Sequence, residues 1–186
     1  MVLETNRLLL RNYTETDIED YWEYVQMPNV GPRAGWPAYT DKNEAVKRLK
    51  LESEKENQFA IVYKDDNKVI GSIELMDCTQ DRYPNIIIDP NSKEIGFILS
   101  ENYWGKGIMV EATKKILEYA FEVLGVDNIY ISHAKANTNS MRVQEKIGFK
   151  VIGELENYRI WVDGNQTSLV ERKMTKDEYF EIKNTF

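Results

Sequence analysis

The chain has 186 residues and a mass of 21.8 kDa, which is enough for one well-buried domain. Its 24 Lys and Arg residues against 31 Asp and Glu residues give a net charge of −7, which argues against general electrostatic binding to nucleic acid or anionic membranes. The single cysteine, Cys78, and the single histidine, His133, exclude an internal disulfide and a Cys- or His-rich metal site, so we expect no metal.

The chain shows no targeting or membrane signal. No stretch approaches the roughly 18 apolar residues that a membrane span needs. The segment Met1–Arg7 lacks the basic and then apolar pattern of a secretion signal. We therefore expect a reduced, cytoplasmic protein without a membrane partner, whose acidic surface suits a cationic substrate such as an amine. The sequence does not distinguish a monomer from a homodimer.

The first half of the chain mixes strand and helix patterns, with turn residues between them. The expected elements are a strand at 7–11, a helix that Thr16 or Asp17 caps and Pro28 ends, an irregular loop at 31–39, a second helix that Thr40 or Asp41 caps and whose apolar side includes Ala45, Val46 and Leu49, and a hairpin of strands at 59–63 and 69–75. A short polar turn joins the two strands of the hairpin.

The second half of the chain contains a strand–helix–strand crossover. The expected elements are a strand at 94–99, a loop at 100–107, a helix at 106–124 that Gly125 stops, a strand at 128–133, a helix at 139–147 that Gly148 ends, a strand beginning at 150–153 and a last strand at 168–174. Because hairpins coexist with this crossover, we predict an α/β fold with a mixed sheet. No repeat or linker divides the chain, so we expect one domain over residues 1–186.

The loop at 100–107 and the helix after it form the most informative segment. Gly105 and Gly107 allow the backbone to approach a ligand closely, and a helix N-terminus presents unpaired amides that favour an anion. Lys106 adds a cation, so the segment predicts a phosphate-binding turn; the alternative is a plain glycine turn with a solvated lysine. The spacing does not match a P-loop, and Val110 stands where a dinucleotide-binding fingerprint needs a small residue.

Five segments stand in a fixed order along the chain: Glu4–Arg11, Glu94–Leu99, Tyr103–Ala112, Asn137–Ser140 and Glu145–Phe149. Together they resemble the GCN5-related N-acetyltransferase (GNAT) family, and more narrowly its RimJ/RimL-like branch, which acetylates the N-termini of ribosomal proteins. The resemblance extends from Leu3 to about Met174. It implies a single-domain GNAT fold, with flanking helices and a splayed strand pair in a mixed central sheet, and acetyl-CoA as the co-substrate.

The resemblance also implies where acetyl-CoA binds. The pantetheine arm would run beside the backbone of the strand at 97–99, like an added strand, and the diphosphate would lie on the amides of residues 104–110. Asn137 and Ser140 would lie near the thioester. The implied binding residues are Phe97, Ile98, Leu99, Trp104, Gly105, Lys106, Gly107, Ile108, Met109, Val110, Asn137 and Ser140. Between residues 133 and 150, four cations and one anion give a local charge of about +3 for a polyanionic ligand.

Two positions depart from the family pattern. Met109 stands at a loop position where a small residue is usual, whereas Trp104, at the other outer position, is usual in the RimJ/RimL-like branch. Gln144 stands where many relatives carry a tyrosine that acts as the general acid. A mechanism that depends on that tyrosine therefore does not carry over to this sequence.

Acetyl transfer to an amine requires a neutral amine and a stabilised departing thiolate. We predict Glu94 as the base, directly or through a water, Ser140 as the residue beside the leaving sulfur, and Asn137 as an orienting group. Their structural alternatives are a solvated strand-end carboxylate, a helix N-cap and a turn residue. The predicted function is an N-acetyltransferase that acts by direct attack in a ternary complex, on a protein N-terminus or a small-molecule amine. The alternative is a non-catalytic acyl-CoA-binding or regulatory module.

Other chemically notable residues have simpler interpretations. We expect His133 to be a packed structural histidine and Cys78 to be a buried small residue rather than a nucleophile. The aromatic residues Trp22, Trp36 and Tyr39 either line the acceptor pocket or pack in the core. Acceptor specificity is expected to reside in the irregular segments 28–39 and 79–92.

Overall fold

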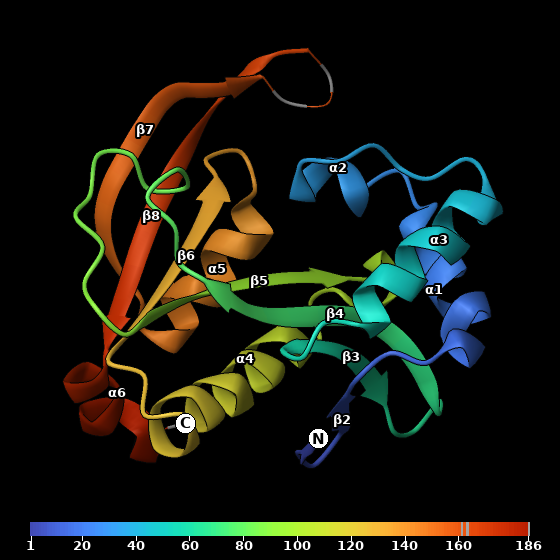
Figure 1. Ribbon diagram of the computed structural model, residues 1–186, viewed down its shortest axis with the longest axis horizontal. Coiled ribbons are helices and arrows are strands. Elements are labelled where there is room, and N and C mark those ends of the chain that lie inside the picture. Colours follow the sequence, from blue (N-terminus) through green and yellow to red (C-terminus); the bar gives the residue numbers. More distant parts are fainter. Residues whose placement is uncertain (161, 163, 186) are drawn as a thin grey trace. The chain divides into compact units, whose positions relative to one another are not determined.

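The computed structural model describes residues 1–160, 162 and 164–185, and these fall into two compact units (Figure 1). The first unit contains residues 1–74 and 97–112, and the second contains residues 75–96 and the described part of 113–186. The chain passes from one unit to the other within the strands β4 (Lys68–Asp77) and β5 (Ser92–Leu99) and within the helix α4 (Ile108–Glu118). A single domain over the whole chain stays a prediction.

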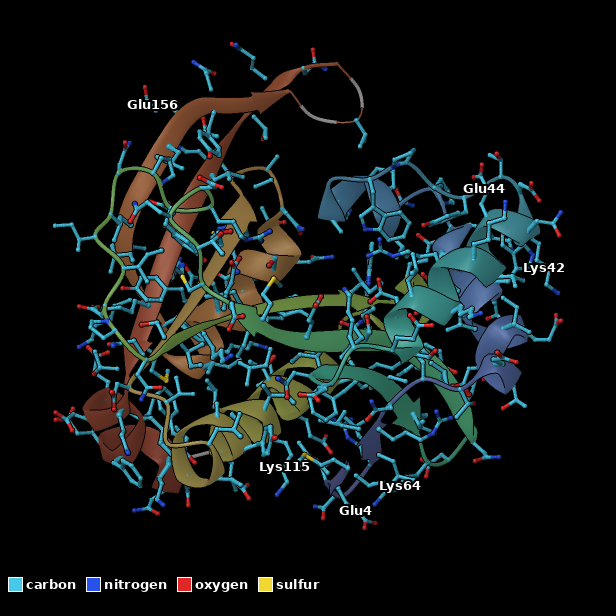
Figure 2. The ribbon with its side chains drawn as sticks, in the orientation of Figure 1. Glu4, Lys42, Glu44, Lys64, Lys115 and Glu156 are labelled. Carbon is cyan, nitrogen blue, oxygen red and sulfur yellow. The ribbon has the colours of Figure 1, made fainter. Side chains whose placement is uncertain are left out.

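Four antiparallel strands in the order β1-β2-β3-β4 form the sheet of the first unit. They are β1 (Val2–Glu4), β2 (Leu8–Arg11), β3 (Gln58–Tyr63) and β4. The strand expected at 7–11 and the expected hairpin are confirmed. β1 was not predicted, because its three residues are too few to show a pattern. Lys64 holds this edge of the sheet, donating to Glu4 Oε1 at 2.6 Å and to Thr5 O at 2.5 Å (Figure 2).

Three α-helices complete the first unit: α1 (Ile18–Val25), α2 (Gly31–Ala34) and α3 (Lys42–Ser53). Asp41 caps α3 by accepting from Asn43 N at 2.8 Å, as predicted. Neither Thr16 nor Asp17 caps α1 with its side chain, because the Asp17 carboxylate instead accepts from the Arg11 guanidinium at 2.7 and 2.8 Å. The short helix α2 lies inside the segment that was expected to be irregular.

A tyrosine-rich core fills the first unit. Tyr13, Tyr21 and Tyr24 are buried, with edge-to-face ring contacts at 5.7 and 5.3 Å. The hydroxyls of Tyr13 and Tyr24 are hydrogen bonded at 2.6 Å, so neither phenol is left unpaired. The aromatic residues singled out from the sequence, Trp22, Trp36 and Tyr39, are partly buried and pack against this core. Ile98 on β5 and Trp104 in the loop before α4 pack against it as well.

The strands of the second unit combine parallel and antiparallel pairs, which confirms the mixed strand pairing. They are β5, β6 (Asn128–Ala134), β8 (Gln166–Thr175) and β7 (Lys150–Ile160), in this order. β5 is parallel to β6, whereas β8 is antiparallel to both β6 and β7. β7 and β8 make the long curved pair in Figure 1. The helices of this unit include α5 (Thr138–Ile147) and α6 (Lys176–Ile182); α6 was not predicted.

β5 and β6 pair over only part of their length. The residues that pair between the two strands run from Ser92 with Asn128 to Glu94 with Tyr130. In the described chain the ladder does not extend to Ile95 or Gly96, although both strands continue. The pair therefore opens after Glu94, which agrees with the splayed strand pair that the resemblance implies.

The helix expected at 106–124 is formed as α4 followed by a wider π turn at Tyr119–Val123. Its apolar stripe is buried from Ile108 to Ala120, but Leu124 is 42% exposed, so the stripe ends one turn earlier than expected. Gly125 follows with φ +69°, a conformation that suits glycine at the end of a helix. Among the described residues, no helix is long and apolar enough to cross a membrane.

Candidate active site

The loop before α4 forms a turn lined by backbone amides. Ser100 N donates to Ile70 O at 2.8 Å, and a 3-10 turn at Glu101–Tyr103 leads to the glycines. Gly105 and Gly107 have φ values of +76° and +74°, a left-handed conformation that strains other residues. Glu111 N donates to Gly107 O at 3.1 Å, so the hydrogen-bond ladder of the helix begins at the carbonyl of Gly107. An exposed turn of this kind at a helix N-terminus is suited to bind phosphate.

A network centred on Glu111 holds this turn. The Glu111 carboxylate accepts from Thr5 Oγ1 at 2.5 Å, from Arg7 N at 3.1 Å and from the Arg7 guanidinium at 2.6 and 2.7 Å. Arg7 Nη1 also donates to the carbonyl oxygen of Lys106 at 3.0 Å. Burial alone would raise the pKa of Glu111, but its hydrogen bonds to Thr5 and Arg7 lower that pKa overall. The Glu4–Arg11 segment thus fixes the turn.

Side chains around the turn leave Gly105, Lys106 and Gly107 exposed. Trp104 Nε1 donates to Leu99 O at 2.9 Å, which ties the loop to the end of β5. The Lys106 ammonium lies 4.8 Å from the centre of the Tyr103 ring, and the side chain is exposed. Met109, which departs from the family pattern, is 5% exposed, so its bulk is inside the protein rather than over the turn.

The end of β5 lies against β4 at a glycine. A Cβ atom on Gly71 would lie 2.4 Å from Ile98 O, so only glycine permits this approach of the two backbones. Phe97, Ile98 and Leu99 are half-buried, unlike the fully buried Ile95. The residues predicted to lie beside the pantetheine arm therefore retain exposed surface in the same unit as the turn.

In the second unit, Glu94 is 1% exposed, which excludes the solvated strand-end carboxylate considered from the sequence. Its two oxygens accept from Arg82 Nε at 2.5 Å and Nη2 at 2.7 Å. Each carboxylate oxygen has a further lone pair besides the one that accepts from Arg82. The sequence did not reveal the Arg82 pairing, because Arg82 lies in an irregular segment.

Cys78 is half-buried rather than buried. Burial and the nearby Glu94 carboxylate raise the pKa of its thiol to about 12, which keeps the thiol protonated near neutral pH. Cys78 is therefore a poor nucleophile, in agreement with the prediction.

The predicted residues on and before α5 are joined by hydrogen bonds. Asn137 is the N-cap of α5, and its Oδ1 accepts from Ser140 N at 3.3 Å. Gln144 Nε2 donates to Ser140 Oγ at 3.1 Å, and Gln144 Oε1 lies 2.9 Å from His133 Nδ1. Gln144 and His133 are buried, and burial lowers the pKa of His133, so its ring is neutral at neutral pH. The half-buried Ser140 accepts from Gln144 and keeps its own proton for another acceptor.

The local positive charge expected at 133–150 is mostly neutralised within the second unit. Lys135 pairs with Glu154, and Lys150 with Glu178 at 2.7 Å, which leaves Arg142 and Lys146 as exposed cations. The sequence count missed these partners because they lie on elements that come later in the chain. As a patch for a polyanionic ligand, this segment is weaker than expected.

Glu171, on β8, is a buried acidic residue that sequence reasoning missed. It is 1% exposed, and among the described residues neither carboxylate oxygen has a hydrogen-bond partner. Burial raises the pKa of this carboxyl. A charged residue at a strand position could have been noticed, but its burial depends on segments distant in sequence. Among the described residues, no group of three His, Cys, Asp or Glu side chains is arranged to hold a metal.

The comparison with known families decides the identity of the chain. Residues 7–150 match the acetyltransferase (GNAT) domain model, which is well over half of the chain. The chain belongs to the GNAT family. It is 30% identical over 163 residues to the uncharacterized N-acetyltransferase p20 of Bacillus licheniformis, with 84% of this chain and 86% of p20 aligned. The GNAT assignment makes the chain an N-acetyltransferase by family and implies acetyl-CoA as its co-substrate.

Solved structures share this GNAT fold. A GNAT acetyltransferase from Bacillus anthracis has a TM-score of 0.82 at 21% identity, covering 96% of this chain and 100% of its own. The spermidine N-acetyltransferase of Vibrio cholerae, in complex with CoA and spermine, has a TM-score of 0.76 at 18% identity, covering 95% and 99%. At these identities the likeness establishes the fold.

Proposed function

We propose that this GNAT protein transfers the acetyl group of acetyl-CoA to a primary amine by direct attack in a ternary complex. The observation that carries the proposal is the amide-lined turn at Gly105–Gly107, held by Arg7 and opening α4. The residues fit a diphosphate: Gly105, Lys106 and Gly107 are exposed at the start of a helix, both glycines adopt the left-handed conformation, and Lys106 supplies a cation. The half-buried end of β5 fits the pantetheine arm as an added strand.

The chemistry assigned to the chain has two parts. Glu94 takes the proton from the amine, directly or through a water, as the nitrogen forms its bond to the acetyl carbon. Ser140 donates a hydrogen bond to the sulfur as the carbon–sulfur bond breaks, and Asn137 orients the N-terminus of α5 and with it Ser140. Because Gln144 occupies a lone pair of Ser140, the hydroxyl proton is available for this role. Direct attack, without an acyl-cysteine, agrees with the raised pKa of Cys78.

Two classes of acceptor are supported by different observations. The resemblance to the RimJ/RimL-like branch supports the α-amine of a protein N-terminus. The shared fold with a spermidine N-acetyltransferase supports a small aliphatic amine. The acidic composition, with a net charge of −7, suits either cationic acceptor.

A thiol-release assay with acetyl-CoA and a panel of amines and N-terminal peptides tests the proposal. We expect free thiol and acetylated amine to appear in equal amounts. A protein that binds acetyl-CoA with measurable heat but releases no thiol with any acceptor is instead the non-catalytic acyl-CoA-binding or regulatory module.

A further inference from the structure

Glu171 is an acidic side chain whose carboxylate has no hydrogen-bond partner among the described residues. Both carboxylate oxygens are buried without a hydrogen bond. Charged neighbours on the same face of the sheet are paired: Glu94 with Arg82, and Lys173 with Asp89 at 2.9 Å. Glu171 therefore differs from these two neighbours, which lie on the same face and have partners of opposite charge.

Small residues and an apolar cluster surround Glu171 on this face of the sheet. Glu171 lies opposite Ser132 on β6 and Gly153 on β7. A Cβ atom at Gly153 would lie 2.6 Å from Glu171 Oε2 and 3.4 Å from Ile86 Cδ1, so the glycine leaves the space that the carboxylate uses. The next residues on this face form a small apolar cluster of Ala134, Leu155 and Leu169.

A buried carboxylate without a partner destabilises the folded protein, because it loses its hydration and gains no compensating charge. Such a cost is typical of residues kept for binding rather than for stability. The complementary ligand is a cation that donates hydrogen bonds and tolerates apolar neighbours. An aliphatic ammonium has these properties, whereas a metal ion requires more ligands than one carboxylate supplies.

The register of the strands relates Glu171 to the candidate base. Glu94 pairs with Tyr130, and Ser132, two residues further along β6, pairs with Glu171. Paired residues and residues two apart point to the same face, so both carboxylates belong to one face of the second unit. Two strand spacings and two residue steps separate their Cα atoms, which corresponds to a distance of roughly 12 Å. This separation is within the span of one extended linear molecule.

We propose that Glu171 determines acceptor specificity by binding a second ammonium group of the acceptor, separate from the amine that is acetylated. The acceptor is then a linear diamine or a larger aliphatic polycation. This inference rests on the proposed function, because it places the reacting amine at Glu94. It goes beyond that function by naming the acceptor class and the residue that selects it.

The test compares linear α,ω-diamines with n-alkylamines of the same chain length. We expect the wild type to prefer the diamines, and Glu171→Gln to lower kcat/KM for the best diamine by about 30-fold or more. The loss should lie mainly in KM. Activity with n-alkylamines and KM for acetyl-CoA should stay within about twofold. Glu156→Gln, which neutralises an exposed carboxylate on β7 (Figure 2), is the matched control and should behave as the wild type.

Binding of the diamine to Glu171 can also be measured without turnover, through the melting temperature of the protein. The diamine should raise the melting temperature of the wild type and of Glu156→Gln, but not that of Glu171→Gln. An equal rise in all three proteins, or no rise in the wild type, overturns the assignment of Glu171. A diamine preference that survives Glu171→Gln overturns it as well. If no amine or peptide is acetylated by the wild type, the proposed function fails instead, and the melting data still decide on Glu171.

Discussion

Replacing Gly107 by alanine is expected to weaken acetyl-CoA binding through the backbone alone. Gly107 has φ +74°, and an added Cβ would contact nothing closer than Arg7 Nη2 at 3.8 Å. The substitution therefore meets no steric barrier, and its cost is that of holding an L-residue in the left-handed region, about 1–2 kcal/mol. If the turn relaxes to escape this strain, its amides no longer converge on one point. The expected loss of affinity is about 5- to 30-fold.

Titration calorimetry with CoA measures this loss directly, and Gly125→Ala is the matched control. Gly125 has φ +69°, and an added Cβ would meet nothing within 4 Å, so its backbone strain is the same. It follows the π turn at the end of α4, away in sequence from the N-terminal turn. Both variants should lose similar thermal stability, but only Gly107→Ala should bind CoA more weakly. Unchanged CoA affinity in Gly107→Ala, or equal weakening in both variants, would refute the role of the turn.

Three further predictions test other parts of the site. Glu94→Gln should lower turnover about 100-fold or more near neutral pH and less at high pH, where the amine is already neutral, so an unchanged pH profile would discard Glu94 as the base. Arg7→Met removes the hydrogen bond to Lys106 O and should weaken CoA binding roughly 2- to 10-fold by calorimetry; an unchanged Kd would show that Arg7 does not hold the turn. Burial raises the pKa of Glu171 in the folded state, so the ionised carboxylate lowers the free energy of unfolding at pH values above that pKa. This destabilisation disappears as the pH falls toward the ordinary pKa of glutamate. Glu171→Gln should therefore raise the melting temperature by about 2–4 °C at pH 8 and by less at pH 4; no difference between the two pH values would contradict this reasoning.

Local features of the sequence predicted the glycine turn and the helix that follows it, while phosphate binding at this turn stays a prediction. Gly105 and Gly107 require only their own backbone conformation, and the amides come from the helix that directly follows. The cap at Asp41 and the helix end at Gly148 were equally predictable, since each depends on neighbouring residues. The splayed strand pair came from family resemblance rather than from any local pattern.

Features that depend on distant segments were not predictable. Arg82 reaches Glu94 from an irregular loop, and Gln144 joins Ser140 to His133 between a helix and a strand. The burial of Glu171 results from the pairing of β8 with two strands, which no window of sequence reveals. Short or terminal elements such as β1 and α6 were missed because they offer too few residues for a periodic pattern to emerge.

The central claim is that the turn at Gly105–Gly107 presents acetyl-CoA to an amine for acetyl transfer. Mass spectrometry of amines and peptides incubated with the full chain and acetyl-CoA labelled in its acetyl group tests this most directly. We expect one labelled acetyl group on the acceptor for each thiol released, with both lost in parallel in Gly107→Pro, which deletes an amide and fixes φ near −65°. Labelled product formed equally well by Gly107→Pro, or bound acetyl-CoA without any labelled acceptor, would contradict the account.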